Sequence, residues 1–102
     1  MFQTISVRQL EAYLESRSRF TLLDVRDRDA YDGSHLEGAV NIPLEELELR
    51  VHELSRDRPV IIYCGHGSRS MQAARFLDER GYHAASVVGG LSYYRGVHLT
   101  VR

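Results

Sequence analysis

Short apolar runs alternate with amphipathic segments along the chain. The runs at 20–25 and 60–63 are almost continuously apolar, which is typical of parallel strands that are covered on both faces. Shorter apolar runs at 39–42 and 85–88 predict two further strands. Because strands and helices alternate with short links, the pattern predicts an α/β fold with a parallel sheet between two helical layers.

Amphipathic segments around these strands predict three helices. The first begins at Ser6, which has Gln9 three residues later in the spacing of a capping box. The second begins at Pro43, whose missing N–H costs little in the first turn of a helix. The third ends at Gly81, a residue suited to a left-handed C-terminal cap. A short helical turn is expected at 27–32, before the strand at 39–42.

The length and composition fit one folded domain over residues 1–102. The chain is 43% hydrophobic and 26% charged, which is ordinary for a globular protein and argues against disorder. The alternation of apolar runs and amphipathic segments, and therefore the expected core, extends from about residue 5 to residue 94. Residues 96–102 show no clear pattern, so we expect a loosely packed tail there.

The charge balance gives no sign of a polyanionic partner. Thirteen basic and fourteen acidic residues give a formal net charge of −1, without a block of like charge. We therefore expect no nucleic-acid and no membrane partner. The N-terminal residues do not form a secretory signal pattern, and no apolar run approaches the roughly 18 residues of a membrane span. These features predict a cytoplasmic protein.

The chain contains a single cysteine, Cys64, so it has no internal disulfide. The histidines show no metal-ligand spacing; they stand at positions 35, 52, 66, 83 and 98. We therefore expect no metal site and no cofactor. A single thiol that is not part of a disulfide also fits a reducing compartment.

Cys64 stands where the strand at 60–63 ends, about five residues before the next helix. Ligands of an open parallel sheet gather at the carboxyl ends of its strands. Gly65 and Gly67 let the backbone turn so that successive N–H groups point inward as an anion-binding nest, and the helix N-terminus adds partial positive charge. A thiolate there should have a lowered pKa and act as a nucleophile near neutral pH.

The rest of the loop supplies further donors. His66 and Arg69 can contact an anionic substrate, whereas Ser68 and Ser70 either donate hydroxyl groups to it or cap the helix. With Cys64 as the catalytic residue, the expected substrate-binding loop consists of Gly65, His66, Gly67, Ser68, Arg69 and Ser70. A small buried cysteine without chemical function is the alternative. The glycine-rich loop and the arginine at the helix start favour the functional interpretation.

The spacing from Cys64 to Arg69 discriminates between two chemistries. Cysteine-dependent phosphatases carry C-x5-R, but this chain has C-x4-R and places Ser70 at the sixth position. A loop that is one residue shorter forms a smaller cradle, suited to one transferable sulfur and poorly sized for a phosphoryl group. A cysteine phosphatase or arsenate reductase is therefore the less favoured alternative.

Three motifs in order resemble the family of single-domain rhodaneses. The N-terminal signature of that family is similar to residues 22–43, LLDVRDRDAYDGSHLEGAVNIP. Its active loop is similar to residues 63–70, YCGHGSRS, and its C-terminal Gly-Gly segment to residues 87–94, VVGGLSYY. The resemblance covers about residues 5 to 94. It implies a rhodanese-like fold, with a five-stranded parallel sheet flanked by helices on both faces.

The resemblance also implies an activity. Thiosulfate, or a related small anionic donor of sulfane sulfur, would load Cys64 as a persulfide, and an acceptor such as cyanide or a thiol would remove that sulfur. A protein thiol is a further candidate acceptor. Because the chain has no second cysteine, the acceptor must come from outside it. The alternative from another class is a non-enzymatic rhodanese-like module that binds a partner or senses sulfane sulfur.

One departure from the family concerns the charge of the loop. Many members that use thiosulfate carry a basic residue directly after the cysteine, where this chain has Gly65. The positive charge of the loop therefore rests mainly on Arg69.

Two residues outside the loop are candidates for supporting the site. Asp24 and Arg26 lie at the carboxyl end of the strand at 20–25, on the edge where the active loop should sit. They could shape the substrate entrance, but a structural ion pair is the favoured interpretation. Similarly, we expect His35 to be a hydrogen-bonded structural histidine and Tyr63 to belong to the core.

Overall fold

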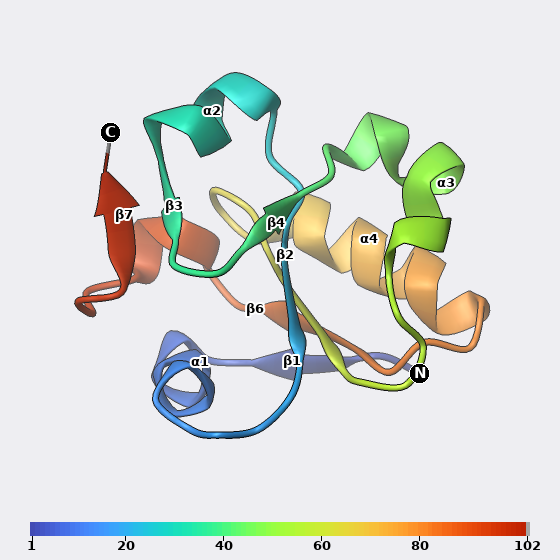
Figure 1. Ribbon diagram of the computed structural model, residues 1–102, viewed down its shortest axis with the longest axis horizontal. Helices are drawn as coiled ribbons and strands as arrows, with labels where there is room; N and C mark the ends of the chain where they lie inside the picture. Colours follow the sequence, from blue (N-terminus) through green and yellow to red (C-terminus); the bar gives the residue numbers. More distant parts are fainter. Residues whose placement is uncertain (102) are drawn as a thin grey trace.

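The centre of the computed structural model, which describes residues 1–101, is a five-stranded parallel sheet (Figure 1). Its strands are β1 (Gln3–Ile5), β2 (Thr21–Asp24), β4 (Val40–Asn41), β5 (Val60–Tyr63) and β6 (Ala84–Val87). They lie in the spatial order β1-β6-β5-β2-β4, and every neighbouring pair is parallel. The predicted α/β fold with a five-stranded parallel sheet is confirmed.

Helices cover both faces of this sheet. The α-helices are α1 (Val7–Leu14), α2 (Arg28–Gly33), α3 (Leu47–Arg50) and α4 (Ser68–Glu79). Three short 3₁₀ helices complete the set: η1 (Leu44–Glu46), η2 (Val51–Glu53) and η3 (Gly90–Tyr93). Figure 1 shows α3 and α4 together, away from α1. None of the helices among residues 1–101 has the length and apolar character needed to cross a membrane.

The alternation of side chains along the central strand explains its continuous apolar run. Val60 and Ile62 of β5 belong to the core that α3 and α4 complete, whereas Ile61 and Tyr63 belong to the core on the α1 face. All four side chains are buried. Successive residues of a strand point to opposite faces, so a strand that is covered on both sides must be apolar throughout.

The predicted helix ends are confirmed at two places. The Ser6 hydroxyl accepts the Gln9 N–H at 3.0 Å, and the Gln9 side chain accepts the Ser6 N–H at 2.8 Å, which completes the capping box. At the end of α4, Gly81 adopts φ +86°. The N–H groups of Gly81 and Tyr82 donate to carbonyl groups in the last turn of α4 at 3.1 and 3.0 Å.

The segment after Pro43 differs from the predicted continuous helix. Pro43 is the capping residue, one position before the first turn, and the helical path is divided into η1, α3 and η2. The 3₁₀ geometry at both ends is the usual way in which a short helix tightens its termini. Leu47 and Leu54 are nevertheless buried against the sheet, so this segment covers its face as expected.

A second sheet lies outside the predicted pattern. β3 (Ser34–Leu36) pairs antiparallel with β7 (Leu99–Val101), and the two strands lie side by side at the edge of the molecule (Figure 1). The segment expected to be a loose tail is therefore partly ordered by backbone pairing, although all three residues of β7 are exposed. Arg102 of that expected tail lies outside the described residues.

Candidate active site

Cys64 lies at the carboxyl edge of the parallel sheet, immediately after the central strand β5. Its side chain is 1% exposed and belongs to the core under α4. The neighbouring strand β2 ends at the same level, with Asp24 in register with Tyr63. The topology thus brings the cysteine to the edge where open parallel sheets bind their ligands.

The loop after β5 forms a cradle of N–H groups around the sulfur. The N–H of Gly67 reaches the Cys64 Sγ at 3.0 Å, and the N–H of Ser70 reaches it at 3.3 Å. Gly67 adopts φ +109° and caps α4, which turns the first N–H groups of that helix toward the sulfur. The expected nest is therefore present, and its hydrogen bonds converge on the thiol.

The structure excludes helix capping by Ser68 or Ser70, one of the two roles that the sequence left open for them. Gly67, and neither serine, occupies the capping position of α4. The Ser70 hydroxyl is buried, lies 3.5 Å from the Cys64 Sγ and hydrogen bonds with the Ser86 hydroxyl at 2.8 Å. Ser68, in contrast, is exposed at the mouth of the site.

The hydrogen bonds around Cys64 outweigh the effect of its burial. Burial raises the pKa of the thiol, whereas the Ser70 hydroxyl and the N–H groups of Ser70, Gly67 and His66 lower it. The net effect is a pKa below the ordinary value of a cysteine. A larger fraction of Cys64 is therefore present as the nucleophilic thiolate near neutral pH.

A second backbone segment, which follows the Gly-Gly pair of residues 89 and 90, supports the loop from outside. The N–H of Leu91 donates to the carbonyl of Cys64 at 2.8 Å, and the N–H of Ser92 donates to the carbonyl of Gly65 at 3.0 Å. Gly89 and Gly90 precede this contact, with φ +77° and +61°. The sequence feature that could locate this segment is a Gly-Gly pair directly after a parallel strand. The carboxyl ends of parallel strands meet at one edge of the sheet, so a turn there lies close to the Cys64 loop.

The mouth of the site is a shallow cavity of about 230 Å³ above the sulfur. It is lined by Arg26, Asp27, Ala30, Cys64, Gly65, His66, Ser68 and Arg69. Of the expected loop residues, Gly65, His66, Ser68 and Arg69 thus line the cavity. Gly67 and Ser70 do not line it, because they contact the sulfur from the turn and from the first turn of α4. Asp27 and Ala30 of the α2 region also line the cavity, although no motif in the sequence marks them as site residues.

The guanidinium of Arg69 is paired with two carboxylates. It contacts Glu45, which lies in η1, and it lies 3.4 Å from Asp27, which caps α2. Sequence reasoning identified neither acid, because both are distant from the loop along the chain. Arg69 was expected to supply the positive charge of the loop, but the two acids neutralise that charge.

Asp24 and Arg26 form the structural ion pair that the sequence favoured. The Asp24 carboxylate is fully buried and lies 2.7 Å from the Arg26 guanidinium. It also accepts the Arg26 backbone N–H at 2.9 Å, while the guanidinium donates to the Ser34 carbonyl. The pair therefore anchors β3 to the end of β2, and Arg26 forms one wall of the cavity.

The structure assigns His35 and Tyr63 to structural positions. The His35 Nδ1 lies 2.8 Å from the Tyr31 carbonyl, and the two rings stack with centroids 3.9 Å apart. The buried Tyr63 hydroxyl accepts the Leu36 N–H at 3.0 Å. His35 is thus hydrogen bonded, and Tyr63 belongs to the core, as the sequence predicted.

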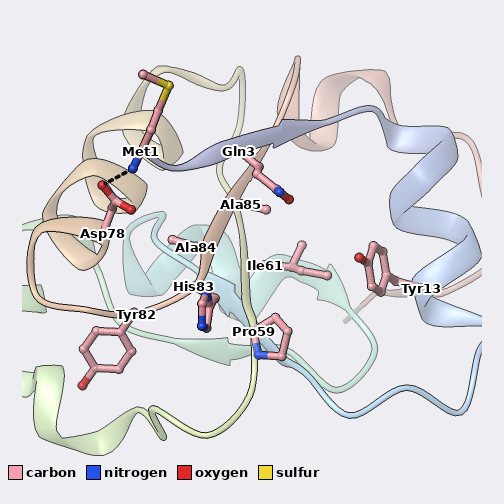
Figure 2. A pocket seen from close by; sticks show the side chains of 10 residues that line it. All are labelled: Met1, Gln3, Tyr13, Pro59, Ile61, Asp78, Tyr82, His83, Ala84 and Ala85. Atoms are coloured by element: carbon pink, nitrogen blue, oxygen red, sulfur yellow. Dashed lines mark ion pairs between the residues drawn. The ribbon is translucent and has the colours of Figure 1, made fainter.

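Two other features of the described residues lie away from Cys64. A cavity of about 280 Å³ at the amino ends of the strands contains the ion pair between the Met1 ammonium and Asp78, at 3.2 Å (Figure 2). Glu11, Glu15 and His98 bring possible metal-ligand atoms within 4.8 Å of one another. The ion pairs between His98 and the two glutamates explain this approach without a metal.

The chain is similar to known proteins over most of its length. Residues 6–96 match the family model described as a rhodanese-like domain. The chain is 35% identical to the thiosulfate sulfurtransferase GlpE of Shewanella oneidensis over 89% of this chain and 90% of that protein. It is 31% identical to the thiosulfate sulfurtransferase GlpE of Coxiella burnetii over 98% and 94%. The solution structure of a rhodanese-like domain from the Anabaena Alr3790 protein superposes with a TM-score of 0.88 at 29% identity, over 100% of this chain and 81% of that chain.

Proposed function

The chain belongs to the rhodanese-like domain family, and we propose that it is a sulfurtransferase that transfers sulfane sulfur through a persulfide on Cys64. The observation that carries this proposal is the thiol itself. Cys64 is the only cysteine of the chain, and N–H groups of Gly67 and Ser70 converge on its sulfur. The same groups are placed to stabilise a sulfur anion.

In the proposed first half-reaction, the Cys64 thiolate attacks the outer sulfur of a donor such as thiosulfate. A new S–S bond forms at Cys64, the S–S bond of the donor breaks, and sulfite leaves with the electron pair of that bond. The terminal sulfur of the persulfide then carries the negative charge. The N–H groups of the loop stabilise that charge, with the positive end of α4 behind them.

In the second half-reaction, a nucleophile removes the terminal sulfur. Cyanide attacks this sulfur, the persulfide S–S bond breaks, thiocyanate leaves, and Cys64 returns as the thiolate. A thiol acceptor would react at the same atom. Because no second cysteine is present, the acceptor, whether a small thiol or a protein thiol, comes from outside the chain. We further propose a cytoplasmic setting, in which the thiol stays reduced between turnovers.

The size of the cradle supports sulfur transfer over phosphoryl transfer. The loop between β5 and α4 consists of residues 64–67, and its hydrogen bonds point to a single atom, the Cys64 Sγ. A phosphoryl group would require donors for three oxygens around the sulfur. We therefore expect no hydrolysis of an aryl phosphate.

The proposal can be tested by measuring the mass of the intact protein. Wild type and Cys64→Ala are incubated with thiosulfate, and cyanide is added afterwards. A gain of one sulfur on wild type alone, reversed by cyanide with release of thiocyanate, is the expected result. If neither thiosulfate nor 3-mercaptopyruvate nor a polysulfide adds sulfur to Cys64, the proposal is wrong, and a non-enzymatic binding module becomes the preferred function.

A further inference from the structure

Both guanidinium groups at the mouth of the site are paired with carboxylates. Two guanidinium groups, those of Arg26 and Arg69, border the cavity. The carboxylate of Asp24 pairs with the first, and those of Asp27 and Glu45 pair with the second. Asp27 lines the cavity with the two arginines, whereas Asp24 is fully buried and Glu45 contacts Arg69 from η1. Neither guanidinium is therefore an unpaired positive charge at the entrance to Cys64.

The positive potential of the site is concentrated at the sulfur. The N–H groups of Gly67 and Ser70 converge on the Cys64 Sγ, which is buried beneath the cavity. One sulfur anion can therefore be stabilised there. Any further charge on a donor must remain in the mouth, beside Asp27 and close to the pair between Arg69 and Glu45; both acids are exposed.

Arg69 is poorly placed to compensate for a second negative charge. Its two partners come from different elements: Asp27 caps α2, and Glu45 lies in η1. If the guanidinium moved to a donor anion, both carboxylates would be left unpaired close to that anion. Like charges in this position repel one another, and the repulsion increases with the charge of the donor.

On the basis of the function proposed above, we propose that the donor of this enzyme is an organic sulfane-sulfur compound with no more than one negative charge. Asp27 and Glu45 are the specificity-determining residues, since they select against a dianion such as thiosulfate. The transfer step is unchanged: the Cys64 thiolate attacks the outer sulfur, and the organic part leaves with the electron pair of the broken bond.

Two donors that differ by one charge provide the test. Thiosulfate is a dianion, and methanethiosulfonate, in which a methyl group replaces one oxygen, is a monoanion. Sulfite leaves from the first and methanesulfinate from the second. We expect the wild-type KM for thiosulfate to exceed that for methanethiosulfonate by about tenfold or more, with cyanide as the acceptor for both donors.

Substitutions identify the residues responsible. Glu45→Gln and Asp27→Asn should each lower the KM for thiosulfate by about three- to tenfold, an effect that weakens at high salt, while the KM for methanethiosulfonate changes little. Glu48→Gln, at an exposed position of α3, is the matched control and should change neither KM. Thermal unfolding of each variant establishes that it is folded.

Several results would overturn the inference. Equal KM values for the two donors in wild type would do so, as would a rise in the KM for thiosulfate in Glu45→Gln, which would mean that Glu45 orients Arg69 to bind the dianion. A parallel fall in both KM values would indicate that the substitution merely opens the mouth. If neither of these two donors, nor 3-mercaptopyruvate, nor a polysulfide adds sulfur to Cys64 in the intact-mass measurement, it is the proposed function that fails.

Discussion

The backbone of Gly90 packs against the carbonyl group of Cys64 so closely that a Cβ at Gly90 would overlap the carbonyl oxygen. Gly90 also adopts φ +61°, which side chains disfavour. We therefore expect Gly90→Ala to lower the free energy of unfolding by about 1–3 kcal/mol. It should also slow sulfur loading, because the displaced loop no longer directs its N–H groups at the thiol. Urea unfolding and the rate of mass gain measure the two effects.

Gly33→Ala is the matched control for this prediction. A Cβ at Gly33, the last residue of α2, would meet no atom within 4 Å. The substitution should change stability by less than about 1 kcal/mol and leave loading unchanged. If Gly90→Ala behaves in the same way, the close packing of Gly90 does not support the loop.

The lowered pKa of Cys64 should be visible in its reaction with an alkylating reagent. The thiolate reacts and the thiol does not, so the midpoint of the rate against pH reports the pKa. We expect a wild-type midpoint below the pKa of an ordinary cysteine. Ser70→Ala removes the hydroxyl at 3.5 Å from the Sγ and should move the midpoint upward.

Ser18→Ala, at an exposed position before β2, is the control and should leave the midpoint unchanged. Because Ser70 also bonds to Ser86, the unfolding transition of Ser70→Ala must be recorded beside the alkylation profile. A folded Ser70→Ala protein with the wild-type midpoint would show that the hydroxyl does not lower the pKa.

The ion pair between Asp24 and Arg26 should be one of the most sensitive points of the fold. Asp24→Asn leaves the guanidinium, whose side chain is only 12% exposed, without its counter-charge. Removing one partner of a buried pair commonly costs about 3–5 kcal/mol, and we expect a loss of about 3 kcal/mol or more in urea unfolding.

The exposed pair between Arg28 and Asp32 provides the comparison. Its atoms are 3.3 Å apart, but the side chains of Arg28 and Asp32 are 74% and 37% exposed, so Asp32→Asn should change stability by less than about 1 kcal/mol. Similar losses in the two variants would mean that burial does not strengthen the Asp24 pair.

His98 should make the stability of the fold depend on pH. The hydrogen bond with Glu15, together with the charges of Glu11 and Glu37, raises the pKa of His98 above its ordinary value. A raised pKa in the folded state means that protonated His98 stabilises the fold. This stabilisation is complete below about pH 6.5, the unfolded pKa, and is lost as the pH rises through the folded pKa.

The difference in Tm between wild type and His98→Gln isolates this effect from other titrations. Wild type should have the higher Tm near pH 5.5–6, and the difference should shrink toward pH 8. His83→Gln is the control, because no ion pair involves His83 among the described residues. A Tm difference that does not vary with pH would contradict the role of protonation.

The elements with strong hydrophobic patterns were predictable from the sequence. The run at 60–63 predicted the central strand, and Ser6 and Gln9 predicted the start of α1, because both signals act over a few residues. The position of Cys64 beside glycines at a strand end likewise predicted the cradle of N–H groups. In each of these cases, the residues that form the sequence signal lie close together along the chain.

The unpredicted features depend on contacts between distant residues. β7 exists because it pairs with β3, some 65 positions earlier, and its exposed side chains carry little pattern. β1 has three residues, too few to show an alternation. The pairing of Arg69 with Glu45 and Asp27 depends on how η1 and α2 meet above the sheet edge, which no local spacing encodes.

The support of the active loop by backbone atoms has a consequence for mutation of the loop. Main-chain groups of Leu91 and Ser92 hold the loop carbonyls, so the exposed side chains of the loop do not determine its shape. A side chain at position 65 would extend into open space, with no atom within 4 Å of its Cβ, and His66 and Ser68 line the mouth. We therefore expect mutation at these three positions to change the mouth of the site while Cys64 and the N–H groups around its sulfur keep their arrangement.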